Sequence, residues 1–137
     1  IYGYKQRIPV WSEAFYNAIS RSYMAININR GKSKKYSSSN RIGSLIGNGL
    51  LTFMDYGKKF DHFFNKNEII FFRDGFDLSS KLSFYKENQN LAKKIAFNGK
   101  KKYFELFNGK EVANYIINRS INYDIKYKPI WEKKILK

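Results

Sequence analysis

The stretch Met24–Asp55, MAININRGKSKKYSSSNRIGSLIGNGLLTFMD, determines the fold that we expect for this chain. Residues 24–29 are mostly apolar and rich in β-forming side chains, which is typical of a buried strand. Residues 30–36 are too polar and too charged for a protein core, so they predict a loop. Residues 50–54 are apolar again and form the next expected strand. The stretch therefore predicts two strands joined by a basic loop and a short helix.

The short helix of this stretch is marked at both of its ends. Ser37–Asn40 offers several side chains that can accept a hydrogen bond from a backbone amide at a helix start. Leu45 and Ile46 would lie on the buried side of the helix. Asn48 and Gly49 both tolerate the left-handed backbone conformation that often ends a helix, so we expect the helix to end there.

Positive charge gathers around the start of this helix. A helix amino terminus beside the carboxyl end of a strand presents backbone amides and a positive dipole to an anion. We therefore expect a phosphate group to bind there. The alternative is that Arg41 pairs with a nearby carboxylate such as Asp55 and that the serines only cap the helix. The basic side chains in question are Arg30, Lys32, Lys34, Lys35 and Arg41.

The segment before this stretch predicts one more helix, over residues 11–20. Ser12 is its expected N-cap, because the hydroxyl can accept a hydrogen bond from an amide of the first turn. Apolar side chains recur in it at helical spacing. We expect Trp11 and Phe15 to pack in the core.

The chain after the stretch continues with a turn and a third strand. Residues 56–59 predict the turn, and 60–64 a short helical turn that packs three phenylalanines under the sheet edge. His62 is the only histidine of the chain. Without a cysteine or a second histidine nearby it indicates a surface position rather than a metal site. Residues 68–72 predict the third strand.

Three helices are expected in the carboxyl-terminal half. Asp77 is the expected N-cap of a helix through Glu87. Residues 90–107 form the clearest amphipathic helix, in which glycine costs about 1 kcal/mol relative to alanine, so Gly99 indicates close backbone packing. Residues 109–119 predict the last helix. The side chains expected to face inward are Leu78, Leu82 and Tyr85, then Leu91, Ile95, Gly99, Tyr103 and Leu106, and finally Val112, Ala113, Ile116 and Ile117.

The other face of the 90–107 helix is rich in lysine. Such a face can contact nucleic acid or an acidic membrane, the latter as a peripheral contact. A solvated surface is the more common explanation of a lysine run, and it is our first expectation. The lysines are Lys93, Lys94, Lys100 and Lys101.

Short strands that alternate with helical segments predict an α/β sandwich with a short, mostly parallel sheet flanked by helices. With 137 residues the chain forms one domain. It contains no cysteine, which fits a reducing compartment, and we expect the cytoplasm. The longest uncharged run, residues 42–54, is shorter than the ~20 apolar residues that a membrane span needs.

The formal net charge of +15, together with 18% aromatic residues, is compatible with nucleic-acid binding through phosphate contacts and base stacking. Lysine, asparagine, isoleucine, tyrosine and phenylalanine are all encoded by A/T-rich codons, so genome composition also explains the excess. The preference for lysine over arginine favours genome composition, because bidentate readout of phosphate or bases uses arginine. We therefore expect nucleic acid not to be the partner.

Five groups of residues carry a family resemblance, which extends roughly over residues 23–117. In their order along the chain they resemble the carboxyl-terminal domain of GT-B glycosyltransferases, most nearly the CgeB/YkvP spore-protein group. The groups are Ile28–Arg30, Ser38–Arg41, Gly47–Thr52, Phe60 with Phe63 and Phe64, and Ile95–Tyr103.

The resemblance implies a partial Rossmann-like sandwich that forms the carboxyl-terminal half of a GT-B fold. It implies a donor-binding domain over residues 11–119. Residues 1–10 would then be a linker or the end of a missing amino-terminal domain, and 120–137 a tail. The active site of such an enzyme lies between two domains, so the resemblance names no catalytic residue.

The resemblance further implies that the carboxyl edge of the sheet binds the diphosphate and ribose of a nucleotide-sugar. The sugar would pass to an unknown glycan or glycoconjugate acceptor. Neither a metal nor another cofactor is expected, in agreement with the lack of a DxD signature. The expected donor- or phosphate-binding residues are Asn29, Arg30, Gly31, Ser38, Ser39, Asn40 and Arg41.

One departure from the family pattern affects the ribose side of this site. Ser44 stands where the pattern has a glutamate expected to accept hydrogen bonds from the ribose hydroxyls, and Gly43 replaces an apolar residue. Serine is shorter and uncharged, so Ser44 is only a candidate for ribose contact. Two alternatives to the transferase therefore stay open: a basic nucleic-acid-binding module, and a catalytically inactive GT-B relative that binds a partner.

Overall fold

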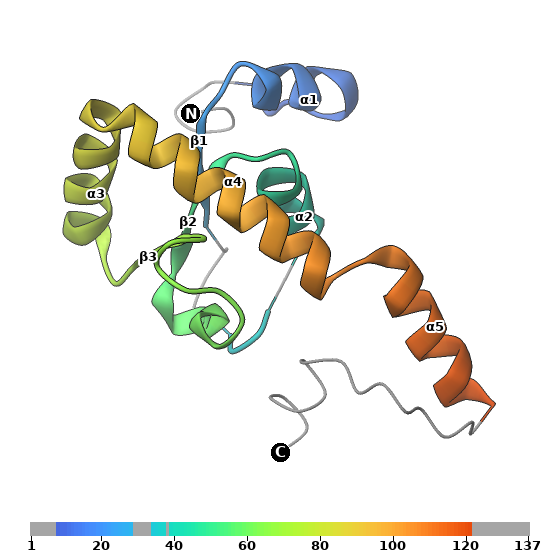
Figure 1. Cartoon of the computed structure of the whole chain (residues 1–137). Coiled ribbons are helices and arrows are strands. Elements are labelled where there is room, and N and C mark those ends of the chain that lie inside the picture. Colours follow the sequence, from blue (N-terminus) through green and yellow to red (C-terminus); the bar gives the residue numbers. More distant parts are fainter. Residues whose placement is uncertain (1–7, 29–33, 38, 122–137) are drawn as a thin grey trace.

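The computed structural model describes residues 8–28, 34–37 and 39–121 (Figure 1). The rest of the expected linker and most of the expected tail lie outside these residues. The elements in chain order are α1 (Ser12–Ser20), β1 (Met24–Asn27), α2 (Asn40–Gly47), β2 (Leu51–Asp55), the 3₁₀ helices Tyr56–Lys58 and Phe60–His62, β3 (Ile70–Phe72), α3 (Gly75–Glu87), α4 (Gln89–Leu106) and α5 (Gly109–Ser120).

The sheet has three strands in the order β1–β2–β3, and both pairs are parallel. Ala25 lies opposite Thr52, and Met54 opposite Phe71. The predicted α/β fold with a short parallel sheet and flanking helices is therefore confirmed. β1 is shorter than expected, because its pairing ends at Asn27. All three strands end at the same edge of the sheet, which we call the carboxyl edge.

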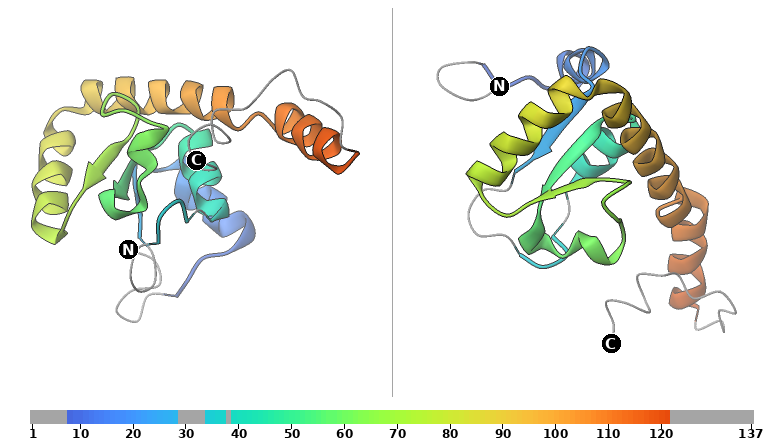
Figure 2. Two further views of the ribbon diagram at one scale, coloured as in Figure 1. Left: turned by 90° about the horizontal axis from the view of Figure 1, so that it is seen from below. Right: turned by 60° about the vertical axis from the view of Figure 1, so that its left-hand side comes forward.

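Alternate residues of β2 pack into different layers. Leu51 and Phe53 pack with Ile95 of α4 and with side chains of α3, whereas Met54 packs with Ile42 of α2. α1 joins the α2 side through Ile19. Figure 2 shows α3 and α4 (yellow to orange) on one side of the sheet and α1 and α2 (blue and teal) on the other. This alternation follows from the two-residue period of a strand.

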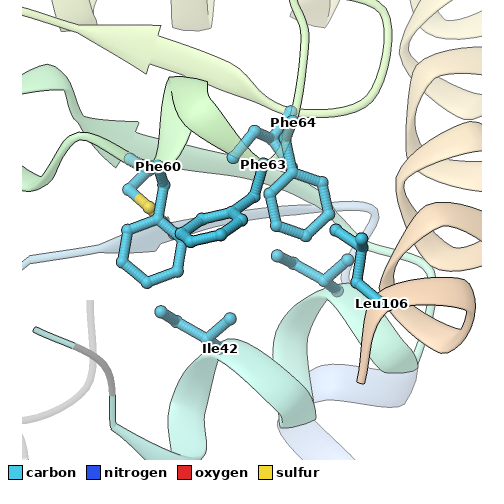
Figure 3. Close-up of a cluster of buried hydrophobic side chains, with 8 residues drawn as sticks. Ile42, Phe60, Phe63, Phe64 and Leu106 are labelled. Carbon is cyan, nitrogen blue, oxygen red and sulfur yellow. The ribbon is translucent and has the colours of Figure 1, made fainter. Parts of the chain in front are cut away.

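A phenylalanine cluster closes the α2 side of the sheet (Figure 3). Phe60, Phe63 and Phe64 are buried, as predicted, and pack in one cluster with Ile42 of α2 and Leu106 of α4. Burial of one such side chain contributes about 1.5–3 kcal/mol. The cluster therefore fixes the chain segment after β2 against both helices.

The carboxyl end of α2 forms almost as predicted. Leu45 and Ile46 are buried, and Gly49 has the left-handed backbone conformation, with φ +78°. Asn48 follows the last residue of α2, as predicted, and has an ordinary backbone conformation with φ −84°. Its side-chain amide donates to the carbonyl oxygen of Ser44 at 2.7 Å, which satisfies a helix-end acceptor.

Two predicted N-caps are wrong. Trp11, not Ser12, is the residue before α1, and Ser12 itself has a positive φ of 48°. Asp74, not Asp77, caps α3, because its carboxylate accepts the hydrogen bond from the Asp77 amide at 2.9 Å. Asp77 lies in the first turn and pairs with Lys81 at 2.8 Å. The hydrogen bond from Lys81, with one from the Arg73 amide, holds the pKa of Asp77 below its usual value.

Several side chains expected in the core are exposed. Trp11, just before α1, is 78% exposed. Leu91 is 41% exposed, because α4 turns Ala92 rather than Leu91 toward the sheet. The inward face predicted for the last helix is also wrong, since Ile116 and Ile117 are each 57% exposed. Figure 1 shows the reason: α5 projects past the end of α4, beyond the sheet that its apolar side chains would need to contact.

The expected close packing at Gly99 is confirmed. A Cβ atom built at this position would lie 2.1 Å from the carbonyl oxygen of Glu68, in the turn before β3. Such a separation is far below van der Waals contact. Only glycine therefore lets α4 lie this close to the sheet.

We expect Gly99→Ala to destabilise the protein. The forced shift of α4 costs about 1–3 kcal/mol, which exceeds the ~1 kcal/mol that alanine gains in a helix. Urea unfolding followed by circular dichroism measures the change. Gly75→Ala, at the first position of α3 with no atom within 4 Å of the added Cβ, is the control and should keep or raise stability. Equal stability of Gly99→Ala and the parent chain would contradict this packing.

Candidate functional site

The structure describes part of the expected phosphate site. Ser39 is the N-cap of α2, and Asn40 and Arg41 begin the helix, with all three exposed. Ser44 lies one turn further along. These residues are brought together at one end of α2, at the carboxyl edge of the sheet. The other candidates, Asn29, Arg30, Gly31 and Ser38, lie outside the described residues.

Arg41 joins the start of α2 to the end of β1. Its Nη2 atom donates to the carbonyl oxygen of Ile28 at 3.1 Å. Asp55, the alternative partner, accepts a hydrogen bond from the Gly57 amide at 2.8 Å. No ion pair between Arg41 and Asp55 occurs among the described residues. The guanidinium group is therefore held at the carboxyl edge by a neutral carbonyl.

Asn27, the last residue of β1, is a buried polar side chain without a partner. It is 0% exposed, and neither its amide nitrogen nor its amide oxygen has a hydrogen bond. It lies two residues after Ala25, which packs on the α1–α2 side, so its side chain faces the same layer. Leaving such an amide unpaired costs about 1–3 kcal/mol. The one other unpartnered buried side-chain atom in the described ranges is Oδ1 of Asp61.

Lys58 is a buried cation at the same edge. It is 1% exposed, and no ion pair to its ammonium group occurs in the part of the chain that the structure describes. Burial lowers its pKa; nearby Arg41 lowers it further, and Asp55 opposes both effects. A buried residue with a pKa shifted by burial and by a neighbouring charge is a candidate functional residue.

Two left-handed backbone positions flank Lys58. Tyr36 has φ +56° and Lys59 φ +58°, and the Tyr36 amide donates to the Lys58 carbonyl oxygen at 2.9 Å. The Tyr36 hydroxyl is hydrogen-bonded to Nδ1 of His62 at 2.6 Å. His62 is exposed, as predicted, and ties the end of the basic loop to the 3₁₀ helices. Strained residues of this kind are maintained by their surroundings and cluster at functional sites.

A cavity of about 1010 Å³ opens between α1, β1 and α2. Arg41 and Ser44 line one wall of the cavity, while Trp11 and Tyr16 line the other. The volume is at the upper end of the range for small-molecule sites. The Ser44 hydroxyl donates to the Asn40 carbonyl oxygen at 3.2 Å, so it remains close to its own helix. The cavity connects the expected phosphate side with exposed aromatic rings.

Sequence reasoning missed Asn27 and Lys58. Each carried a partial signal: Asn27 is a polar residue inside the predicted 24–29 strand, and Lys58 lies in the turn predicted after the 50–54 strand, near the edge where ligands bind in parallel sheets. In the described ranges no group of three or more His, Cys, Asp or Glu side chains could hold a metal ion. None of the helices described is long and apolar enough to cross a membrane.

Comparison with known proteins gives one match. The family model described as "Glycosyl transferase-like" matches residues 2–118, which include both sides of the candidate site. No curated protein and no solved structure matches the chain.

We expect Asn27→Val to stabilise the protein by about 1–3 kcal/mol, because it removes a buried amide that has no partner. Thr52→Val on the neighbouring strand is the matched control. Thr52 is equally buried, but its hydroxyl donates to the Leu50 carbonyl oxygen at 3.1 Å, so its loss should cost about 0.5–1.5 kcal/mol. Urea unfolding of both variants tests the opposite signs. A loss of stability in both would show that Asn27 is satisfied in solution.

Lys58→Met should raise stability most at neutral pH. The pKa of Lys58 in the folded chain lies below its ordinary value of 10.5, which applies to the unfolded chain. At a pH between these two pKa values, the unfolded chain binds more protons than the folded chain. Raising the pH through this window therefore favours the folded parent chain, and the difference between variant and parent should shrink toward pH 10.5. Urea unfolding across this range measures it, with exposed Lys66→Met as control. A difference independent of pH would contradict the buried charge.

Proposed function

The chain belongs to the glycosyl transferase-like family, and we propose that it is the donor-binding domain of a GT-B glycosyltransferase. In this proposal, a nucleotide-sugar binds at the carboxyl edge of the sheet and its glycosyl group passes to a glycan or glycoconjugate. The acceptor side and the catalytic residues would come from a second domain. The 137-residue chain by itself is expected to bind a donor weakly and to transfer nothing.

The observation that carries this proposal is the convergence of Asn27, Arg41 and Lys58 on one edge. The side-chain amide of Asn27 has no hydrogen-bond partner. Arg41 and Lys58 are basic and lie close enough for Arg41 to lower the pKa of Lys58. Each arrangement costs free energy unless a partner compensates it. A diphosphate would reverse both effects, because it accepts hydrogen bonds and neutralises the two cations. The amides at the start of α2 would add a favourable dipole.

The adjoining cavity supports a nucleoside next to the diphosphate. Its volume of about 1010 Å³ accommodates a ribose and a base. Ser44 and Asn40 line the wall that leads away from Arg41, in the position proposed for the ribose. The exposed rings of Trp11 and Tyr16 on the other wall offer stacking surfaces for a base.

Finer features of the proposal rest on the sequence. Asn29, Arg30, Gly31 and Ser38 would complete the phosphate site, and the order of the motif residues supports a place in the CgeB/YkvP-type group. The cysteine-free composition supports a reducing compartment such as the cytoplasm. The donor is proposed to bind without a metal.

A second candidate function is a GT-B-like interaction domain without transfer activity. Ser44 favours it, since it replaces the glutamate of the family pattern and its hydroxyl donates within its own helix. A nucleotide would then lose the charged acceptor expected for its ribose hydroxyls. Donor binding at the phosphates and loss of transfer would together indicate this second function.

Calorimetric titration of the chain with uridine and guanosine diphosphates tests the donor site. Arg41→Ala should weaken binding by about 1.5–3 kcal/mol, roughly tenfold to a hundredfold in affinity, because a charge-assisted contact to phosphate is lost. Arg21→Ala, an exposed arginine at the end of α1, is the matched control and should leave the affinity unchanged. Identical titrations for Arg41→Ala and the parent chain would remove Arg41 from the site.

A further inference from the structure

The outer face of α4 places two phenylalanines between four lysines. At about 100° per residue, Phe97 and Phe104 lie within about 20° of each other around the helix and ~10 Å apart along it. The lysines lie on both flanks, within about 40–60° of Phe97. Two are on one flank and two on the other: Lys93 and Lys100, then Lys94 and Lys101.

This face is open to solvent. Phe97 is 68% exposed and Phe104 51% exposed, and all four lysines are exposed. The opposite face of the helix is the one that packs, through Ala92, Ile95 and Gly99. Figure 2 shows the same arrangement, with α4 lying across the outside of the molecule. Neither phenylalanine is buried in the core, although the ring of Phe104 reaches α2, where its Cζ atom lies 3.8 Å from a Cβ built at Gly47.

The charge of the face is almost entirely positive. Glu105 is the acidic residue of α4, and it lies at the edge of the face, 3.4 Å from Lys102. The lysine flanks are thus not neutralised by carboxylates of their own helix. A purely solvated surface, which the lysine run alone suggests, does not account for two large aromatic side chains at its centre.

We propose that the outer face of α4 binds the surface of an anionic lipid bilayer. Phe97 and Phe104 would enter the boundary between headgroups and acyl chains, while the lysine stems extend sideways so that their ammonium groups reach lipid phosphates. The Lys100 stem already lies along the protein surface, with its Cδ atom 3.6 Å from a Cβ built at Gly49. The surface shares no residue with the donor site, so this inference stands apart from the proposed function.

The shape of the face favours a bilayer over a single-stranded nucleic acid. Proteins that bind single strands track the backbone along a positively charged groove lined with aromatic rings. Here the aromatic side chains form the ridge of a convex helix, and the face contains no arginine. A bilayer is a plane onto which such a ridge can dock.

Co-sedimentation with phosphatidylcholine vesicles, with and without phosphatidylglycerol, tests this surface. The parent chain should bind the anionic vesicles and not the neutral ones. Lys93→Glu/Lys101→Glu should lower the partition coefficient by about tenfold or more. Lys66→Glu/Lys86→Glu changes the net charge equally at two exposed lysines outside α4 and should lower it much less. Equal losses in both double variants would overturn the proposal.

The phenylalanines are tested separately from the charge. Phe97→Ala/Phe104→Ala should weaken vesicle binding several-fold, whereas Phe76→Ala/Phe84→Ala, at exposed positions of α3, should not. In Phe97→Trp, anionic vesicles should shift the tryptophan emission to shorter wavelength, relative to the parent chain. An unshifted emission, or loss of oligonucleotide binding rather than vesicle binding in the α4 variants, would overturn the proposal in favour of a nucleic-acid surface or none.

Discussion

The parallel pairing of β1 with β2 is the constraint on which the candidate site depends. It places Asn27 opposite Met54, so the chain leaves both strands at the same edge. α2 leads from the end of β1 back to the start of β2 at the opposite edge. Its first turn therefore lies at the carboxyl edge, where Arg41 donates to the Ile28 carbonyl. In an antiparallel pair, β2 would instead end at the opposite edge of the sheet, and Lys58 would lie far from Asn27. The direction of one strand pair thus decides which polar groups meet.

The polar groups at this edge lower the stability of the folded chain. Asn27 is completely buried among core residues, and its side-chain amide has no hydrogen bond. Lys58 is 1% exposed, and burial lowers the pKa of its ammonium group. The phenylalanine cluster and the core beneath α4 offset these costs, because they bury large apolar side chains on both faces of the sheet. Sites for charged ligands commonly combine local instability with a rigid scaffold.

α4 packs against the rest of the molecule through one face and exposes the opposite face to solvent. Gly99 brings its inner face against the Glu68 carbonyl, closer than any larger residue permits. Gly43 of α2 is matched to the same helix, since a Cβ there would lie 2.7 Å from the Tyr103 hydroxyl. The inner face also buries Ile95 and Leu106, whereas Phe97 and Phe104 lie more than half exposed on the outer face.

The sequence by itself determined the class of fold, the order of the elements, the buried phenylalanines and the position of Gly99, because periodicity and glycine are local signals. It also located the start of α2, although the direct contact of Arg41 with β1 appears only in three dimensions. The tertiary structure alone decided that Asn27 and Lys58 are buried at one edge, that Asp74 rather than Asp77 caps α3, and that Ile116 and Ile117 face solvent. Burial depends on what packs above a residue, and the spacing of residues along one helix or strand does not contain that information.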